Sequence, residues 1–193
     1  MKKLIICVIA LIVTTVIIFS AQTVAYFSDG LDDNVVMTLV GSNLSGELIE
    51  TTIPTDGGDP IVGPTPVKII PGVTVKKSVS VKNTGELAMY LRVTVDKEFG
   101  LSKENEGKTV DPALVGLELN DEYWELKDGF YYYKLPLSKG ASTEPLFTTV
   151  SFSPEMDNTY TNSTITLRIM AYATQVENNG ATVFDAQGWP EVK

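Results

Sequence analysis

The sequence contains no histidine, and this absence excludes several classes of enzyme at once. Without an imidazole the chain cannot assemble a Ser-His-Asp triad, a histidine-ligated zinc centre or the His-Glu-x-x-His helix of metalloproteases. The sequence also lacks a glycine-rich loop that follows a strand and opens a helix, the pattern that holds phosphate groups. We therefore expect no enzyme, no catalytic residues and no bound cofactor.

The first 25 residues have the three-part layout of a secretory signal peptide. A positive start at Lys2 and Lys3 precedes an apolar core over residues 4–19, and small or polar residues follow over 20–25. The core is shorter than the ~20 residues that a membrane-spanning helix needs. We expect export and removal of this segment. The alternative is an uncleaved anchor, because flanking residues can help a short apolar helix to span a bilayer.

Signal-peptide cleavage is expected between Ala25 and Tyr26, after residues small enough for a peptidase pocket. Removing 25 of the 193 residues leaves one domain, residues 26–193, and takes away Cys7, the only cysteine. A secreted domain without disulfides must be held by burial and sheet hydrogen bonds. A signal peptidase is the partner expected during export, and membrane contact is expected only through the uncleaved leader.

Basic residues are scarce: the chain has 15 lysines and arginines against 24 acidic residues, for a formal net charge of −9. Loss of two lysines with the leader makes that charge −11 in the mature chain. Nucleic-acid binding needs a basic surface, so we expect no nucleic-acid partner.

Alternation of apolar and polar residues predicts an all-β domain. Residues 73–81 place valine at alternate positions, with Lys77 as the one exception, and residues 87–95 repeat the alternation. The Asn83-Thr84-Gly85-Glu86 stretch between them has the composition of a tight turn. These features predict an antiparallel hairpin.

Further short strands are expected from aromatic and β-branched residues at 35–40, 47–53, 130–135, 146–152 and 164–175. Exposed loops are expected where proline, glycine or charge accumulates, at residues 54–66 and 98–111, and short helical turns near 112–115 and 181–187. Many short alternating strands with polar turns predict an antiparallel two-sheet β-sandwich of jelly-roll-like or immunoglobulin-like type.

Two groups of acidic residues offer oxygen ligands or a carboxylate pair. The group near the mature N-terminus could bind calcium and consists of Asp29, Asp32, Asp33 and Asn34. The later group could suggest a glycosidase and consists of Glu118, Asp121 and Glu122. The first spacing does not match an EF-hand loop. Acidic turns between strands are the commoner explanation for both groups, so we expect no metal site.

Three consecutive tyrosines, Tyr131 to Tyr133, could form a stacking platform for sugar rings. Strand alternation sends Tyr132 to one face and its two neighbours to the other. We therefore expect these side chains to divide between core and surface.

Short motifs along most of the chain share their order with a known family. They are Thr23–Asp29, Pro71-Gly72, Val79–Gly85, Tyr90–Val93, Phe130–Gly140 with Thr143 and Leu146-Phe147, Ala173–Gln175, and Trp189. In this order they resemble the TasA and camelysin (CalY) family. The resemblance implies export through a SipW-type signal peptidase, a jelly-roll fold and assembly into extracellular fibres of a biofilm matrix. Camelysin is also described as a metalloprotease, an activity that the missing histidine and zinc helix do not support here.

The resemblance further implies that the segment freed by cleavage adds as a strand to a neighbouring subunit. The donor expected here is residues 26–40, with the groove-filling side chains Tyr26, Phe27, Val35, Met37 and Leu39. The alternative is that residues 35–40 form the first strand of their own domain. We expect a secreted structural protein of the matrix or cell surface that assembles with itself or related fibre subunits; the alternative is a monomeric surface-binding or adhesion module.

Overall fold

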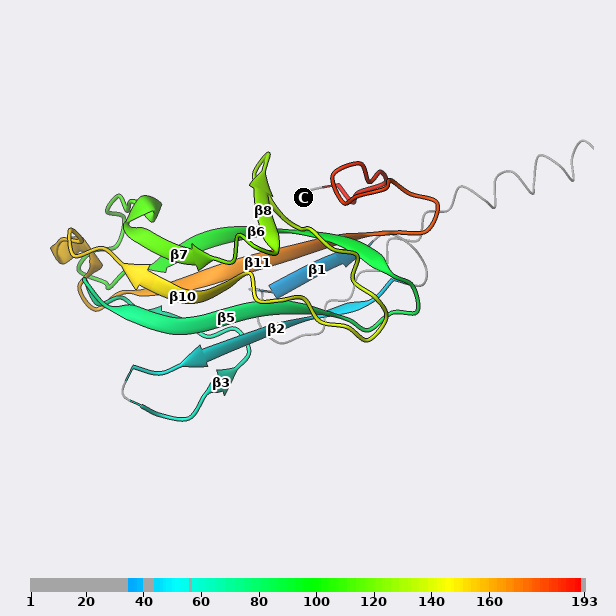
Figure 1. Ribbon diagram of the computed structural model, residues 1–193. Helices are drawn as coiled ribbons and strands as arrows, with labels where there is room; N and C mark the ends of the chain where they lie inside the picture. The colour runs from blue at the N-terminus through cyan, green and yellow to red at the C-terminus, as the bar shows by residue number, and fades with distance from the viewer. Residues whose placement is uncertain (1–34, 40–43, 56, 192–193) are drawn as a thin grey trace, which may run out of the picture.

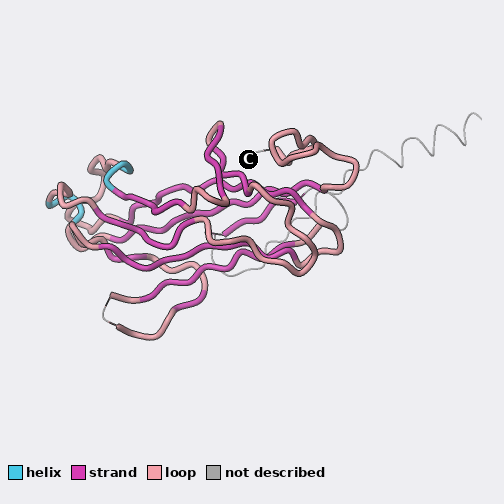
Figure 2. Tube along the Cα trace, viewed as in Figure 1, coloured by secondary structure: helices cyan, strands magenta, loops and turns pink. Residues whose placement is uncertain are grey.

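Two β-sheets packed face to face make up the fold (Figure 1). The computed structural model describes residues 35–39, 44–55 and 57–191. Within these ranges the helical elements are two 3₁₀ turns, η1 (Pro112–Leu114) and η2 (Asn158–Tyr160), as the tube in Figure 2 shows. No helix of the described ranges has the length and apolar character that a membrane crossing requires.

The sheet that we call sheet A has six strands. Its order is β1 (Val35–Leu39), β11 (Thr164–Gln175), β6 (Met89–Gly100), β9 (Phe130–Tyr133) and β8 (Trp124–Lys127), with β4 (Val67–Lys68) also paired to β11. Sheet B has the order β3 (Ile61–Val62), β2 (Gly46–Ile53), β5 (Thr74–Asn83), β10 (Phe147–Phe152) and β7 (Val115–Leu119). All pairings of these strands are antiparallel except that of β1 with β11, which is parallel.

The chain passes repeatedly from one sheet to the other. The connections from β5 to β6, from β6 to β7, from β7 to β8, from β9 to β10 and from β10 to β11 all change sheet. Such wrapping is typical of jelly rolls, in which two sheets are built from interleaved strands. The prediction of an all-β, jelly-roll-like sandwich is confirmed.

The predicted hairpin of residues 73–81 and 87–95 is wrong. Both segments are strands, but β5 pairs with β2 and β10 in sheet B, whereas β6 pairs with β11 and β9 in sheet A. The connection between them is a crossover held by Asn83, whose Nδ2 donates to the carbonyl oxygens of Leu87 at 2.8 Å and Leu137 at 2.9 Å. The two valine-rich faces therefore meet across the core instead of lying side by side.

A tight hairpin lies between β8 and β9. Asp128 and Gly129 join these strands with positive φ angles of 51° and 80°. Two residues with positive φ form the turn that best matches strand twist, and only glycine and a few polar residues adopt that conformation at low cost. Asp-Gly is a composition that favours such a turn, although the sequence patterns did not identify β8 as a strand.

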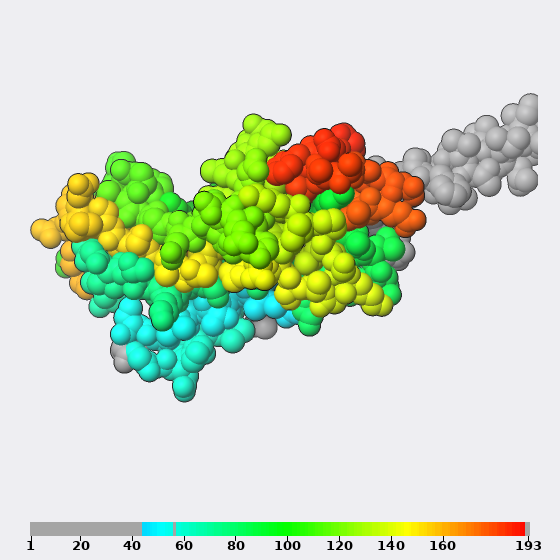
Figure 3. Space-filling model, in the orientation of Figure 1, coloured from blue at the N-terminus to red at the C-terminus, as the bar shows by residue number. Residues whose placement is uncertain are grey.

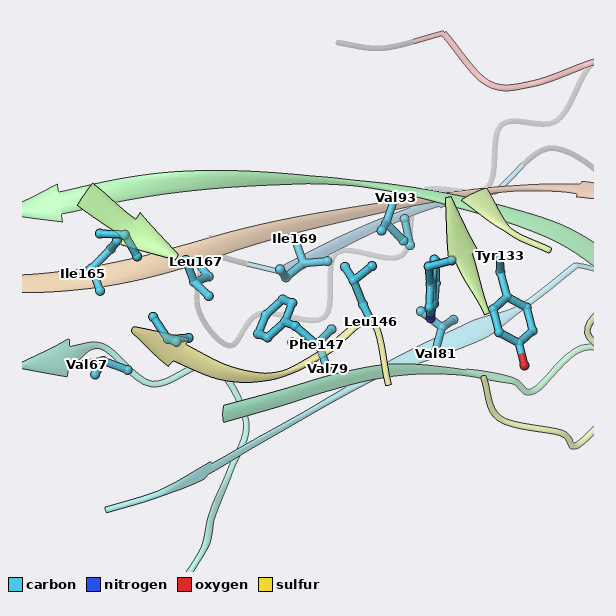
Figure 4. Packing of buried hydrophobic residues seen from close by; sticks show 14 of the residues in the cluster. Val67, Val79, Val81, Val93, Tyr133, Leu146, Phe147, Ile165, Leu167 and Ile169 are labelled. Atoms are coloured by element: carbon cyan, nitrogen blue, oxygen red, sulfur yellow. The ribbon is translucent and has the colours of Figure 1, made fainter. Parts of the chain in front are cut away.

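The hydrophobic core fills the space between the two sheets (Figure 4). Sheet A contributes Ile165, Leu167 and Ile169 from β11, and sheet B contributes valines of β5 and Phe147 of β10. Each of these side chains is almost fully removed from water, and full burial of such a residue stabilises a fold by roughly 1.5–3 kcal/mol. In a chain whose described part has no cysteine, this burial carries most of the stability.

A Phe147→Ala substitution tests this dependence. Phe147 is fully buried at the centre of the core, so its loss should lower the free energy of unfolding by about 3–5 kcal/mol. Lys76→Ala on the exposed face of β5 is the control and should change stability by less than about 0.5 kcal/mol. Urea unfolding of both variants measures the effect, and equal midpoints would contradict a shared inter-sheet core.

Candidate functional site

The outer edge of β11 is completed by two short strands from the N-terminal half of the chain. One edge of β11 pairs with β6 over its full length, from Thr164 to Gln175. The other edge pairs with β4 at Thr164 and Ile165, and with β1 over residues 169–173. Residues 166–168 lie between these two partners, and no described strand pairs with them on that edge. This edge of β11 therefore pairs with short strands that are distant from it in the sequence.

β1 occupies this edge in parallel orientation. Val35, Met37 and Leu39 lie in register with three residues of β11 that are themselves fully buried, Ile169, Ala171 and Ala173. These three predicted donor residues therefore belong to the first strand of a sheet in their own chain, which is the alternative that the sequence left open. Tyr26 and Phe27 lie outside the described residues, as do Ala25 and the predicted cleavage site.

Chain connectivity does not force β1 into this position. β1 and β11 stand at opposite ends of the domain's sequence, and no tight turn joins them. β1 is also the terminal strand of sheet A, with no second strand partner among the described residues. An edge strand held on one side can be supplied by its own chain or by another copy, because backbone hydrogen bonds carry the pairing in both cases.

An apolar corner lies where β2 and β3 approach β4. Ile53 and Val62 are exposed on the opposite face of the β2–β3 hairpin, and Val62 has 76% of its surface open to solvent. Ile61 and Ile70 are exposed at the corner itself. Beside them is a cavity of about 190 Å³ lined by Thr52, Pro54, Thr55, Ile61, Thr65, Pro66, Val67, Lys68, Ile70 and Val75. Figure 3 shows the β2–β3 hairpin, in cyan and teal, standing out from the body of the molecule.

A buried ion pair lies behind this cavity. Lys77, the exception to the valine pattern of β5, points inward with 1% of its side chain exposed and binds Glu50 of β2, which is 2% exposed. Two cavity-lining residues hold the same ammonium group: Nζ of Lys77 donates to Thr52 Oγ1 at 2.9 Å and to the Thr65 carbonyl oxygen at 3.1 Å. Sequence reasoning noted Lys77 but missed Glu50, although Glu50 occupies an inward position of its strand.

The three consecutive tyrosines divide between the two faces of their strand, as alternation predicted, but the side expected to be surface is also buried. Tyr131 and Tyr133 pack against the main core, whereas Tyr132 joins a second cluster on the outer face of sheet A. That cluster includes Tyr90, Val183 and Ala186, and residues 176–191 cover it. Because Tyr132 and Tyr133 retain only 9% and 5% of their exposed surface, they do not form an open platform for sugar rings.

Arg92 organises this second cluster. Its guanidinium lies 3.9 Å from the ring centroid of Phe130 and 4.6 Å from that of Trp189, so it is stacked between a strand and the C-terminal segment. The Tyr90 hydroxyl donates to the Gly180 carbonyl oxygen at 2.9 Å. Burial at the edge of this cluster raises the pKa of Tyr172, which keeps its hydroxyl neutral.

The acidic groups do not gather into a catalytic or metal site in the part of the chain that is described. Glu118 lies on β7 and accepts a hydrogen bond from Thr149 Oγ1 at 3.0 Å, and Asp121 and Glu122 lie on the exposed turn that follows. None of the three lines the apolar cavity. Asp29, Asp32, Asp33 and Asn34 lie outside the described residues. Among the residues described, no three acidic, histidine or cysteine side chains are placed to hold a metal ion.

An Arg92→Met substitution should loosen the C-terminal segment. Cation–π stacking contributes roughly 0.5–2 kcal/mol, so amides of residues 183–189 should exchange with deuterium about two- to thirtyfold faster. Arg168→Met, on the neighbouring β11 and outside the aromatic stack, is the matched control and should leave these amides unchanged. Equal exchange rates of these amides in the two variants would show that Arg92 does not hold the C-terminal segment. Hydrogen–deuterium exchange with mass spectrometry provides the measurement.

Comparison with known proteins returned no relatives: no family model matches the chain, and neither a curated protein nor a solved structure matches it significantly. The resemblance to the TasA and camelysin family stays a prediction that depends on the order of the motifs.

Proposed function

We propose that the chain is a secreted structural subunit of extracellular fibres, of the TasA-like kind, that assembles head-to-tail by strand donation from its N-terminal segment. The observation that carries the proposal is the edge of β11, where β1 is held as a short, parallel terminal strand. This edge fits a segment from another copy as well as it fits the chain's own.

Strand exchange at this edge has a small energetic cost. A donated β1 would repeat the pairing that the chain's own β1 makes with residues 169–173, so the hydrogen bonds lost in one copy are regained in the next. The donor segment and the acceptor edge are different surfaces. Contacts of this head-to-tail kind propagate as open filaments when rotation between copies does not close a ring.

Signal-peptide cleavage serves as the switch in this proposal. Before cleavage between Ala25 and Tyr26, the leader ties the donor segment to the membrane; after cleavage, Tyr26 begins a free arm. The formal charge of −11 keeps released subunits apart until they assemble, or lets divalent cations bridge fibres. Matrix or cell surface is the proposed location, and the partners are further copies or related fibre subunits.

Negative-stain microscopy of the mature protein tests strand donation. The protein that starts at Tyr26 should form filaments, and a variant that lacks residues 26–39 should not, because it retains the acceptor edge but has no donor. The matched control removes the C-terminal Val192 and Lys193 and should polymerise normally. Filaments of equal length from the variant that lacks the donor would overturn the proposal.

A competitor peptide gives a second, independent test. A synthetic peptide of residues 26–40 should cap growing filaments by occupying the edge of β11, which shortens them as its concentration rises. A peptide of the same composition in scrambled order is the control. Light scattering follows growth, and identical effects of the two peptides would argue against a specific strand acceptor.

A monomeric surface-binding module is the second candidate, and the exposed apolar side chains of β3, Ile61 and Val62, favour it. Analytical ultracentrifugation separates the two functions. A mature chain that stays monomeric at all concentrations, and whose attachment to cells is lost in an Ile61→Ser, Val62→Ser variant, would support the module in place of the fibre.

A further inference from the structure

Glu50 and Lys77 lie close together on neighbouring strands of sheet B, where water does not reach them. In the register of β2 and β5, Thr52 is opposite Lys77 and Glu50 is opposite Val79, so the two charged residues are diagonal neighbours on the inward face. Their exposed fractions are 2% and 1%. Charged groups this deeply buried are costly unless all their polar atoms have partners.

The two carboxylate oxygens of Glu50 differ in their surroundings. Oε1 contacts Nζ of Lys77 and accepts a hydrogen bond from the backbone N–H of Thr65 at 3.2 Å. Oε2 is buried and has no hydrogen-bond partner among the described residues. Oε1 is therefore held by two donors, whereas no hydrogen bond holds Oε2. A simple ion pair does not require this difference between the two oxygens.

We propose that Glu50 and Lys77 form an intramolecular amide bond. One proton passes from Nζ of Lys77 to Oε2 of Glu50, and the lone pair of the neutral amine attacks the carboxyl carbon Cδ. A second proton then passes from the nitrogen to Oε2 as the Cδ–Oε2 bond breaks. One N–Cδ bond forms, Oε2 leaves as water, and one proton stays on the amide nitrogen. The condensation changes no oxidation state and needs no co-reactant.

The surroundings of the pair favour each part of this reaction. The backbone N–H of Thr65 stabilises negative charge on Oε1 as the tetrahedral intermediate forms, because a fixed donor aimed at a developing oxyanion lowers the barrier. Thr52 Oγ1 and the Thr65 carbonyl oxygen hold Nζ in place beside the carboxyl group. The product has no charges, so the desolvation cost of the buried ion pair disappears.

The amide would supply a covalent tie to a domain that has no cysteine after loss of the leader. It links β2 to β5 and closes the segment that contains β3, β4 and the apolar corner. This part of sheet B includes the edge strand β3, which has the fewest backbone partners to hold it. The inference is independent of fibre assembly, because the two residues lie within one chain.

The mass of the denatured, full-length exported protein tests the proposal directly. We expect it to be lighter by one water molecule than the mass calculated from its own N-terminus. Trypsin should then release a branched peptide in which residues 77–82 are joined to the fragment ending at Lys68, because an acylated Lys77 is not cleaved. A full calculated mass, or a water loss that maps to other residues, would overturn the proposal.

Substitutions at the two positions give matched controls. Lys77→Arg and Glu50→Ala should restore the full mass, whereas Lys76→Arg, on the exposed face of the same strand, should keep the water loss. Glu50→Gln should give the same branched peptide with loss of ammonia in place of water. The wild-type mass decides the matter even where a variant fails to fold, since it is measured on the denatured chain.

Discussion

The register of β11 against β6 is the constraint on which the other parts of the structure depend. The two strands pair over twelve residues of β11, and this pairing sends Ile165, Leu167 and Ile169 inward together. A slip of one residue would turn every one of these side chains to the opposite face. β1 and β4 pair with the other edge of β11, and β9 pairs with β6. The β11–β6 pair therefore positions both the acceptor edge and the second cluster.

The extent to which the sequence predicted the fold depends on what alternation can encode. The bounds of β11 were predicted correctly, because a buried apolar residue occupies every second position from Ile165 to Ala173. The hairpin of β5 and β6 was wrong, because alternation shows which face of a strand is buried and not which strand lies beside it. β3, β4, β7 and β8 were missed because they are short: β3 and β4 have two residues each, β8 has four and β7 has five.

The candidate sites were harder to predict, because they depend on residues that are distant in sequence. Lys77 was visible as a break in the valine pattern, but its partner Glu50 belongs to a strand whose pattern is mixed. Alternation places Arg92 on the outward face of its strand, and nothing nearby in the sequence indicates that Trp189 covers it. The acceptor edge depends on the order of the strands in sheet A. Among the described strands none pairs with the full length of this edge of β11, and no local sequence pattern encodes that order.

The covering of sheet A by residues 176–191 fixes where the domain ends. The outward side chains of Tyr90 and Tyr132 look like surface positions by alternation, yet they are buried because a third layer lies over them. A domain boundary drawn after Gln175, where the last strand ends, would remove that layer. Sheet A would then expose the hydrophobic residues of its outer face to solvent. Any shortened form of this protein must therefore keep the chain through Trp189, well beyond its last regular element.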